Sequence, residues 1–318
     1  MNSTLRSWVL TDGKQGMESQ CLGLTDALDM KPDILRIAPR FPWSVLPPQL
    51  WAAPLSAPGP DGDTLTPPWP DLLISTGRQT VAPVLAIKKI QQDRIVVIQL
   101  QNPTVDPARF DLVISPSHDG LTGANVVATL GALHRVTPTR LQIEAARFAG
   151  RYAALPRPMV AVLLGGDNRH FSMTPKSAYR LGSLLAQVAE KHGAGLAITA
   201  SRRTGTANLE RIGRALEGYH VDIWNGDGDN PYFGMLGLAD AIVVTGDSVN
   251  MVSEACATGK PVHVSHLDGA SGKFGRFHAA LEAQGITRPF EGRLENWRYT
   301  PPNDVTRAAM AVRKLLVC

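Results

Sequence analysis

The sequence predicts an α/β protein with two Rossmann-like domains, each built on a parallel sheet. Short apolar runs rich in Val and Ile alternate with longer segments of helical periodicity along most of the chain. This alternation stops at Leu155–Pro158 (LPRP), a predicted linker, and then starts again. A length of 318 residues suits two domains of about 150 residues each. Strands joined by helices pair in parallel through right-handed crossovers, so each half is expected to form its own sheet.

The N-terminal domain is expected to cover residues 1–154. Its strands are predicted at the short apolar runs, which are Ser7–Thr11, Asp33–Ile37, 71–75, 94–100, Asp111–Ser115 and 125–131. Its helices are predicted over Gly16–Met30, 81–90 and 139–154. Between them, the Pro- and Trp-rich segment Phe41–Pro70 is expected to be a loop or short helix. It either covers the core or presents an apolar patch to a lipid or a partner.

The C-terminal domain is expected to cover residues 159–302. Its strands are predicted at Met159–Gly165, 195–200, 221–224, 241–244 and 261–265. Its helices are predicted over Pro175–His192, Thr206–Gly218, Pro231–Leu238, the segment before Gly259, and Phe274–Ala283, with a last helix of the chain over Asp304–Leu316. Ligands of such sheets bind beyond the carboxyl ends of the strands, so the strand-to-helix turns are the places to look for a site.

Composition limits the classes of partner. The chain is 44% hydrophobic and 19% charged, which excludes a disordered chain, and its net charge is +4 with a pI near 9.0. This mild excess permits anionic ligands such as nucleotides or phospholipid head groups, whereas the lack of a Lys/Arg block argues against nucleic acid. Three scattered cysteines without metal-ligand spacing, Cys21, Cys256 and Cys318, indicate a reducing compartment. With no signal peptide and no apolar run of about 18 residues, a cytoplasmic location is expected.

The turn TGDS and the helix that follows it, Thr245–Val262, carry the main hypothesis. Asp247 is predicted as the N-cap of this helix and Gly259 as its C′ residue, and capping alone would explain much of the segment. The turn also offers backbone N–H groups and small side chains at a helix N-terminus, which attract phosphate; these residues are Thr245, Gly246 and Ser248. Glu254 lies seven residues after Asp247 on the same helix face, and its carboxylate suits the two hydroxyl donors of a ribose.

Two more turns of this half, Leu163–Pro175 and Ile198–Gly205, are expected to converge on the same cleft. Their candidate anion-binding residues are Gly165, Gly166, Asn168, Ser201, Arg202 and Arg203. Lys273 joins them from the segment GKFGRFH. The alternatives are an ordinary glycine-rich turn and a solvated basic turn. Asp227-Gly228-Asp229 has the letters of a metal motif but lies in a glycine-rich loop, so no metal site is expected.

The first half offers candidate bases after its strands. His118 and Asp119 could each serve as a general base if buried with a pKa near 7, although a surface loop is the commoner setting for such residues. The turn around Asp12 opens a helix but has neither the GxGxxG nor the P-loop pattern, so neither dinucleotide nor P-loop chemistry is expected there.

Several motifs together resemble a known family. TDGKQGMESQ, STGRQT, GGDNRHF, SRRTG, the segment NPYFGMLGLADAIVVTGDSVNMVSEACATGKPV and the tail GRLENWRYTPPND are similar to the "elongated mitochondria" fission family over nearly the whole chain. Its bacterial members are described as predicted glycosyltransferases, and older descriptions call them predicted nucleoside-diphosphate-sugar epimerases. The second half also resembles glycosyltransferases of the two-Rossmann-domain (GT-B) type.

This resemblance implies a GT-B-like fold, with two domains facing a cleft and residues 303–318 crossing back to the first domain. It implies a nucleotide-sugar donor as substrate, with no further cofactor or metal, Glu254 on the ribose, and Gly166, Ser201, Arg202, Thr245, Gly246 and Ser248 on the diphosphate. Asp12, His118 or Asp119 is then the candidate base. The expected acceptor is a lipid-linked or envelope glycan, reached through peripheral contact with the inner face of the membrane.

Three other functions remain open from the sequence. A non-hydrolysing nucleotide-sugar epimerase would use the same donor pocket, and a non-catalytic binding or scaffold protein would keep the fold alone. A serine hydrolase is suggested only by the letters GDS, since no Asp-x-x-His partner follows Ser248.

Overall fold

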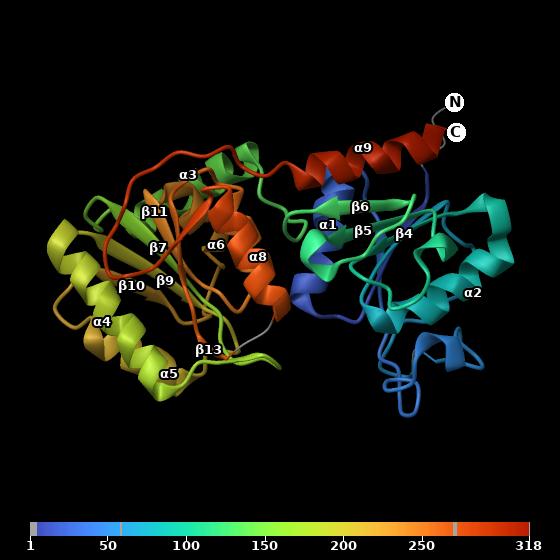
Figure 1. Cartoon of the computed structure of the whole chain (residues 1–318), viewed down its shortest axis with the longest axis horizontal. Helices are drawn as coiled ribbons and strands as arrows, with labels where there is room; N and C mark the ends of the chain where they lie inside the picture. Colours follow the sequence, from blue (N-terminus) through green and yellow to red (C-terminus); the bar gives the residue numbers. More distant parts are fainter. Residues whose placement is uncertain (1–4, 58, 270–271, 318) are drawn as a thin grey trace. The chain divides into compact units, whose positions relative to one another are not determined.

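The computed structural model describes residues 5–57, 59–269 and 272–317, so Cys318 lies outside the described residues. The chain forms two compact units: unit 1 contains residues 1–135 and 303–318, and unit 2 contains residues 136–302 (Figure 1). Each unit holds one parallel six-stranded sheet, which confirms the predicted α/β fold. The helix that the sequence predicts over 139–154, within an N-terminal domain of residues 1–154, spans Pro138–Tyr152 and belongs to unit 2. That the two units fold as independent domains remains a prediction.

The sheet of unit 1 has the strand order β2-β1-β3-β4-β5-β6. The strands are β1 (Ser7–Thr11), β2 (Asp33–Arg36), β3 (Leu72–Thr76), β4 (Val96–Leu100), β5 (Leu112–Pro116) and β6 (Val126–Thr129). The helices of this unit are α1 (Gln15–Ala27), α2 (Val81–Gln91) and α9 (Asp304–Val317). Short 3-10 helices fill several connections: Pro48–Leu50, Arg78–Thr80, Gln92–Arg94, Pro107–Arg109 and Ser117–Asp119.

Both faces of this sheet are covered, which explains the continuous apolar runs in its strands. Val9 and Ile74 pack with Cys21 of α1 and Ala308 of α9, whereas their neighbours along the strands pack with α2 on the other face. If one face of the sheet were exposed to solvent, polar and apolar residues would alternate along each strand instead. Helix α9, the last of the chain, lies beside α1, the first (Figure 1).

The sheet of unit 2 has the order β10-β9-β7-β11-β12-β14. The strands are β7 (Met159–Leu164), β9 (Gly195–Ala200), β10 (Val221–Trp224), β11 (Ala241–Thr245), β12 (Val262–Ser265) and β14 (Thr287–Pro289). The helices are α3 (Pro138–Tyr152), α4 (Pro175–His192), α5 (Thr206–Ala215), α6 (Tyr232–Leu238), α7 (Val249–Cys256) and α8 (Gly272–Ala283). Strands β8 (Phe171–Ser172) and β13 (Asp268–Gly269) form a small antiparallel pair.

Helices α3 and α6 pack closely because glycines face the contact. A Cβ at Gly237 would lie 2.5 Å from the carbonyl oxygen of Leu141, and one at Gly234 would lie 2.8 Å from Cβ of Phe148. The backbone of α6 is therefore held against α3, which fixes the position of the residues at the start of α6.

The Pro- and Trp-rich segment of unit 1 partly covers the core and partly exposes apolar side chains. Trp51 and Ala57 are buried against Ala82 of α2, so part of the segment covers the core. Phe41, at 82% exposure, with Val45 and Leu50, faces outward. No charged residue occurs from Phe41 to Pro60. The guanidinium of Arg78 donates to the carbonyl oxygens of Ser44, Val45 and Leu46, which holds this outward surface in one conformation.

Candidate functional site

The order of strands in unit 2 places a topological switch point between β7 and β11. From β7 the chain moves outward through β9 and β10 on one side and then returns to β11 on the other side of β7. Ligands of open parallel sheets bind at such a point, beyond the carboxyl ends of the strands. The three turns singled out from the sequence follow β7, β9 and β11, which are neighbours in this sheet. The candidate site is therefore this set of three turns.

The carboxylate of Asp247 links all three turns. Its oxygens accept hydrogen bonds from the N–H of Gly166 (3.0 Å) and the hydroxyl of Thr245 (2.7 Å). The Arg203 guanidinium forms an ion pair with it at 2.9 Å, and the Asp247 side chain is fully buried. One buried carboxylate thus receives donors from the β7 turn, the β9 turn and the end of β11. The sequence analysis missed this role.

The prediction that Asp247 caps the following helix is wrong. The N-cap of α7 is Ser248, whose Oγ accepts a hydrogen bond from the N–H of Met251 at 3.4 Å. Asp and Ser are nearly equivalent as N-caps, so the local sequence could not choose between two adjacent residues. Gly259 has a left-handed φ of 74°, but it lies two residues beyond the C-cap Ala257 and is therefore not the C′ residue that the sequence predicts; its N–H donates to the carbonyl oxygen of Cys256.

The double glycine of the β7 turn is required by its close neighbours. A Cβ at Gly165 would lie 2.1 Å from Oδ1 of Asp247, and one at Gly166 would lie 2.0 Å from the carbonyl oxygen of Arg203. The N–H of Gly165 donates to the Thr245 hydroxyl at 2.7 Å, and the amide of Asn168 donates to the Asp247 carbonyl at 3.1 Å. No side chain larger than hydrogen fits at either glycine without moving the turn.

The two arginines of the β9 turn differ in their surroundings. The Arg203 guanidinium also donates to the carbonyl oxygens of Gly166 and Asp167, at 3.3 and 3.4 Å. This side chain therefore links the β9 turn to the β7 turn. Arg202 is exposed. Ser201 is half-buried beside them, and its Oγ accepts from the N–H of Arg203 at 3.3 Å. Both arginines are exposed residues, and Arg203 is the one that joins the β9 turn to the β7 turn.

Two histidines lie close to Gly246: His278 of α8 and His266, which follows β12. His278 of α8 is buried, and its Nε2 lies 2.7 Å from the Gly246 carbonyl oxygen. Because a carbonyl only accepts, Nε2 carries the proton. Burial lowers the pKa of His278, which favours the neutral ring. The exposed Lys273 lies near the start of the same helix.

Glu254 is buried in α7, with 8% of its surface exposed. The hydroxyl of Tyr232, the first residue of α6, donates to its Oε2 at 2.6 Å. Burial raises the pKa of Glu254 to about 7, whereas the Tyr232 hydrogen bond and the charge of Arg140 act in the opposite direction. Burial also raises the pKa of Tyr232, so this hydroxyl stays protonated and is a donor. The sequence analysis did not identify Tyr232.

The raised pKa of Glu254 gives a testable dependence of stability on pH. Between about pH 4.5 and pH 7 the folded protein holds a proton on Glu254 that the unfolded chain has lost, so this residue's contribution to stability falls as the pH rises. The difference in unfolding free energy between wild type and Glu254→Gln should change by on the order of 3 kcal/mol across that window. Unfolding in urea at pH 4.5 and pH 8 measures it. Glu282→Gln, at an exposed position, is the control, and an equal pH dependence in all three proteins would contradict the assignment.

The candidate bases lie in unit 1 at the carboxyl ends of its strands. Asp12 follows β1 and forms an ion pair with the exposed Lys14. His118 and Asp119 follow β5 and are both buried at the side chain, 4.0 Å apart, and Ser115 donates to Asp119 at 3.2 Å. Strands β1 and β5 are separated by β3 and β4, so the two positions are about 14 Å apart at a spacing of about 4.8 Å per strand. The structure therefore places Asp12 apart from the His118–Asp119 pair.

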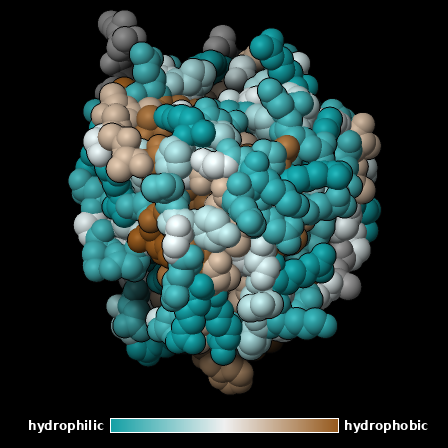
Figure 2. All heavy atoms as spheres, turned by 90° about the vertical axis from the view of Figure 1, so that its left-hand side faces the viewer, coloured by the Kyte–Doolittle hydropathy of each residue, from teal (hydrophilic) through white to brown (hydrophobic). Residues whose placement is uncertain are grey.

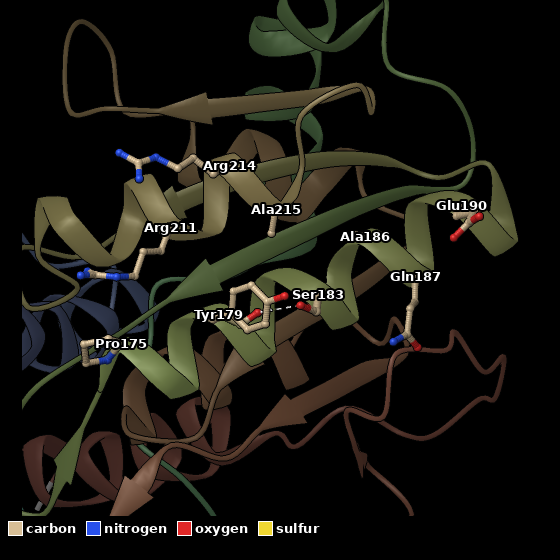
Figure 3. Close-up of a pocket in the computed structure, with 9 residues that line it drawn as sticks. All are labelled: Pro175, Tyr179, Ser183, Ala186, Gln187, Glu190, Arg211, Arg214 and Ala215. Carbon is tan, nitrogen blue, oxygen red and sulfur yellow. Dashed lines mark hydrogen bonds between the residues drawn. The ribbon is translucent and has the colours of Figure 1, made fainter.

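A groove of about 650 Å³ lies elsewhere in unit 2, between α4 and α5 (Figure 3). Tyr179 and Ser183 of α4 and Arg211 and Arg214 of α5 line it. None of the predicted site residues borders it. The face of unit 2 on the α4 side is largely hydrophilic (Figure 2). The polar turns at the switch point, rather than this open groove, carry the specific interactions.

Among residues 5–57, 59–269 and 272–317, no three His, Cys, Asp or Glu side chains gather as metal ligands would. In the same part of the chain, every helix is too short or too polar to cross a lipid bilayer.

Solved structures similar to this chain include an epimerase and a glycosyltransferase. UDP-GlcNAc 2-epimerase from Neisseria meningitidis, solved with UDP-GlcNAc, aligns over 98% of this chain and 100% of its own with a TM-score of 0.54 and 13% identity. The glycosyltransferase SnogD from Streptomyces nogalater aligns over 98% of this chain and 95% of its own with a TM-score of 0.53 and 15% identity. At these identities the likeness shows the fold alone, which is GT-B-like, as predicted.

Sequence comparison identifies the family. The Arabidopsis thaliana mitochondrial fission protein ELM1 is 34% identical over 274 residues, which cover 78% of this chain but only 64% of the plant protein. The family model described as mitochondrial fission ELM1 matches residues 15–316. The resemblance inferred from the motifs is thereby confirmed, and the chain belongs to the mitochondrial fission ELM1 family.

Proposed function

We propose that this protein is a GT-B-type glycosyltransferase that uses a nucleotide-activated sugar without a metal ion. The observation that carries the proposal is the construction of the switch point in unit 2. Three turns are joined there through one buried carboxylate, and a second buried carboxylate, Glu254, lies in the helix that the last turn opens. A packed fold does not require both carboxylates, because burying each one costs free energy.

The proposed donor geometry follows from the helix that starts at this site. Backbone N–H groups at the N-terminus of α7 and the glycine-rich β7 turn are suited to a diphosphate. Glu254 lies six positions after Ser248, a rise of about 9 Å along the helix. In the proposed complex the carboxylate accepts hydrogen bonds from the ribose hydroxyls, which follow the phosphates. The solved neighbour bound to UDP-GlcNAc supports a donor of this class.

The site residues divide into two proposed roles. Thr245, Asp247, Arg203 and the two glycines of the β7 turn set the shape of the turns, because their polar groups already pair with one another. Ligand contacts are proposed for the other candidates, which are Asn168, Ser201, Arg202, Gly246, Ser248, Glu254 and Lys273; several of these also hydrogen-bond within the protein, so a ligand would add to those bonds. The exposed guanidinium of Arg202 and the ammonium of Lys273 suit the charge that develops on a leaving diphosphate.

In the proposed reaction, an acceptor hydroxyl oxygen bonds to the anomeric carbon of the sugar. The bond from that carbon to the diphosphate oxygen breaks, and the nucleoside diphosphate leaves. A base takes the hydroxyl proton, for which Asp12, His118 and Asp119 remain the candidates. The side chains of all three candidates are nearly inaccessible, so burial does not choose among them.

A lipid-linked or envelope glycan is proposed as the acceptor, with peripheral membrane contact and a cytoplasmic location. The support is the uncharged segment Phe41–Pro60, whose Phe41, Val45 and Leu50 are exposed, and whose backbone around Val45 is held by hydrogen bonds from Arg78. Apolar side chains presented by an ordered loop match the interface of a bilayer.

The second candidate is a nucleotide-sugar 2-epimerase, because several of the structurally similar proteins are UDP-GlcNAc 2-epimerases. The two functions differ in what happens without an acceptor. The full-length protein is incubated with UDP-GlcNAc alone and the sugar is analysed by NMR. A transferase leaves the configuration at C2 unchanged and releases UDP only when an envelope-glycan acceptor is added. Formation of the C2 epimer would replace the proposal with the epimerase, and saturable binding without any turnover would indicate a binding protein.

A further inference from the structure

Tyr232 and Glu254 form a buried pair that joins α6 to α7. The 2.6 Å hydrogen bond from the Tyr232 hydroxyl occupies Oε2 of Glu254. A carboxylate has a second oxygen, Oε1, which can accept further donors. Glu254 is buried, with 8% of its surface exposed. The pair thus leaves a buried carboxylate that is held at one oxygen by a fixed hydroxyl and has a second oxygen able to accept.

The position of Tyr232 is itself fixed by packing. The contact at Gly234 and Gly237 holds α6 against α3, as described above. Phe233, the next residue along α6, lies under the Arg140 guanidinium of α3, with 4.0 Å from Cζ to the ring centroid. Stacking of this kind restrains both side chains. The Tyr232 hydroxyl is therefore presented to Glu254 from a rigid support.

Arg140 provides an alternative attraction for the same carboxylate. Its charge acts on Glu254, lowering the pKa of that residue against the effect of burial. Without the Tyr232 hydroxyl, the carboxylate would be free to turn about its side-chain torsions toward this guanidinium. A hydrogen bond from a fixed hydroxyl is directional, whereas the attraction to a nearby charge is not.

We propose that Tyr232 is a positioning residue that holds Glu254 for a ribose hydroxyl and thereby makes the site selective for ribonucleotides. This inference rests on the proposed function, because it needs a nucleotide at the switch point. A site whose buried polar group is aimed at a substrate hydroxyl discriminates strongly against the analogue that lacks it. If Glu254 is no longer held in this orientation, the binding of ribonucleotides should weaken, and the binding of deoxynucleotides should stay nearly unchanged.

The test measures the dissociation constants of UDP and 2′-deoxy-UDP by calorimetry on the full-length protein. Wild type should bind UDP at least tenfold more tightly than 2′-deoxy-UDP. In Tyr232→Phe the ratio should fall below threefold, mainly through weaker binding of UDP. Tyr179→Phe, at an exposed tyrosine of α4, is the matched control and should keep the wild-type ratio.

The outcomes separate this inference from the function on which it rests. Wild type that binds neither nucleotide contradicts the proposed function. Wild type that binds both equally, or Tyr232→Phe that keeps the tenfold preference, overturns the role of Tyr232 alone. If Tyr232→Phe does not fold, Glu254→Gln gives the decisive ratio: it should also lose the preference, and a retained preference would overturn the inference.

Discussion

Replacing Asp247 with alanine is expected to destabilise unit 2 by about 2–4 kcal/mol. Removing one partner of a buried ion pair costs about 3–5 kcal/mol, and the 38% exposure of the Arg203 side chain reduces that penalty. The substitution also leaves the buried N–H of Gly166 without its acceptor. Asp247→Asn keeps an oxygen of the same shape but loses the charge, so it should fall between alanine and wild type.

Hydrogen exchange locates this effect within the chain. Peptides covering β7, β9 and β11 should lose protection in Asp247→Ala, whereas peptides covering β1 and β3 of unit 1 provide an internal reference. Asp229→Ala is the matched control, because Asp229 pairs with Arg147 at the surface and its side chain is 72% exposed. The control should change stability by no more than about 0.5 kcal/mol. Unchanged protection around β11 in Asp247→Ala would show that this carboxylate does not hold the turns together.

Replacing Glu254 with alanine is expected to weaken nucleotide-sugar binding by about 10- to 100-fold. A hydrogen bond to a charged group contributes about 1.5–3 kcal/mol. The substitution removes the carboxylate that is proposed to accept hydrogen bonds from the ribose. Stability should change little by comparison. The loss of the Tyr232 hydrogen bond is offset in part by relief from burying an ionisable group.

A comparison of affinity with stability separates the two roles of Glu254. Calorimetric titration gives the affinity and urea unfolding gives the stability of the same preparations. Glu282→Ala in α8, an exposed position, should match wild type in both measurements. An unchanged affinity in Glu254→Ala would reduce Glu254 to a packing residue and remove the main support for the ribose contact.

Most of the elements were predictable because their signals are local, whereas the short strands β8, β13 and β14, of two or three residues each, were not predicted. Continuous apolar runs such as Met159–Leu164 are typical of strands covered on both faces, and the structure confirms them within one or two residues. Pro175–His192 was predicted with its exact bounds, since Thr174 caps its start and the left-handed Gly193 ends it. Fold class followed from the order of these elements along the chain.

The interactions that build the candidate site were not predictable, because they join residues far apart in the sequence. Asp247 was interpreted as a cap, yet its partner Gly166 lies 81 positions earlier. Glu254 was identified as a buried polar residue without a capping role, but its partner Tyr232 lies on a different helix, 22 positions away. The sequence predicts that the three turns meet, because they follow strands of one parallel sheet, but it does not show which of their polar groups are already paired with one another.

The most direct test of the central claim is a thermal-shift titration of the full-length protein with UDP-GlcNAc, UDP and other nucleotide sugars. At a concentration of 100 times its dissociation constant, a ligand that binds the folded state should stabilise it by about 2.7 kcal/mol. We expect such a shift with at least one nucleotide sugar in wild type, and a much smaller one in Glu254→Ala at the same concentration. The absence of a shift with every nucleotide and nucleotide sugar would contradict a nucleotide site in this protein.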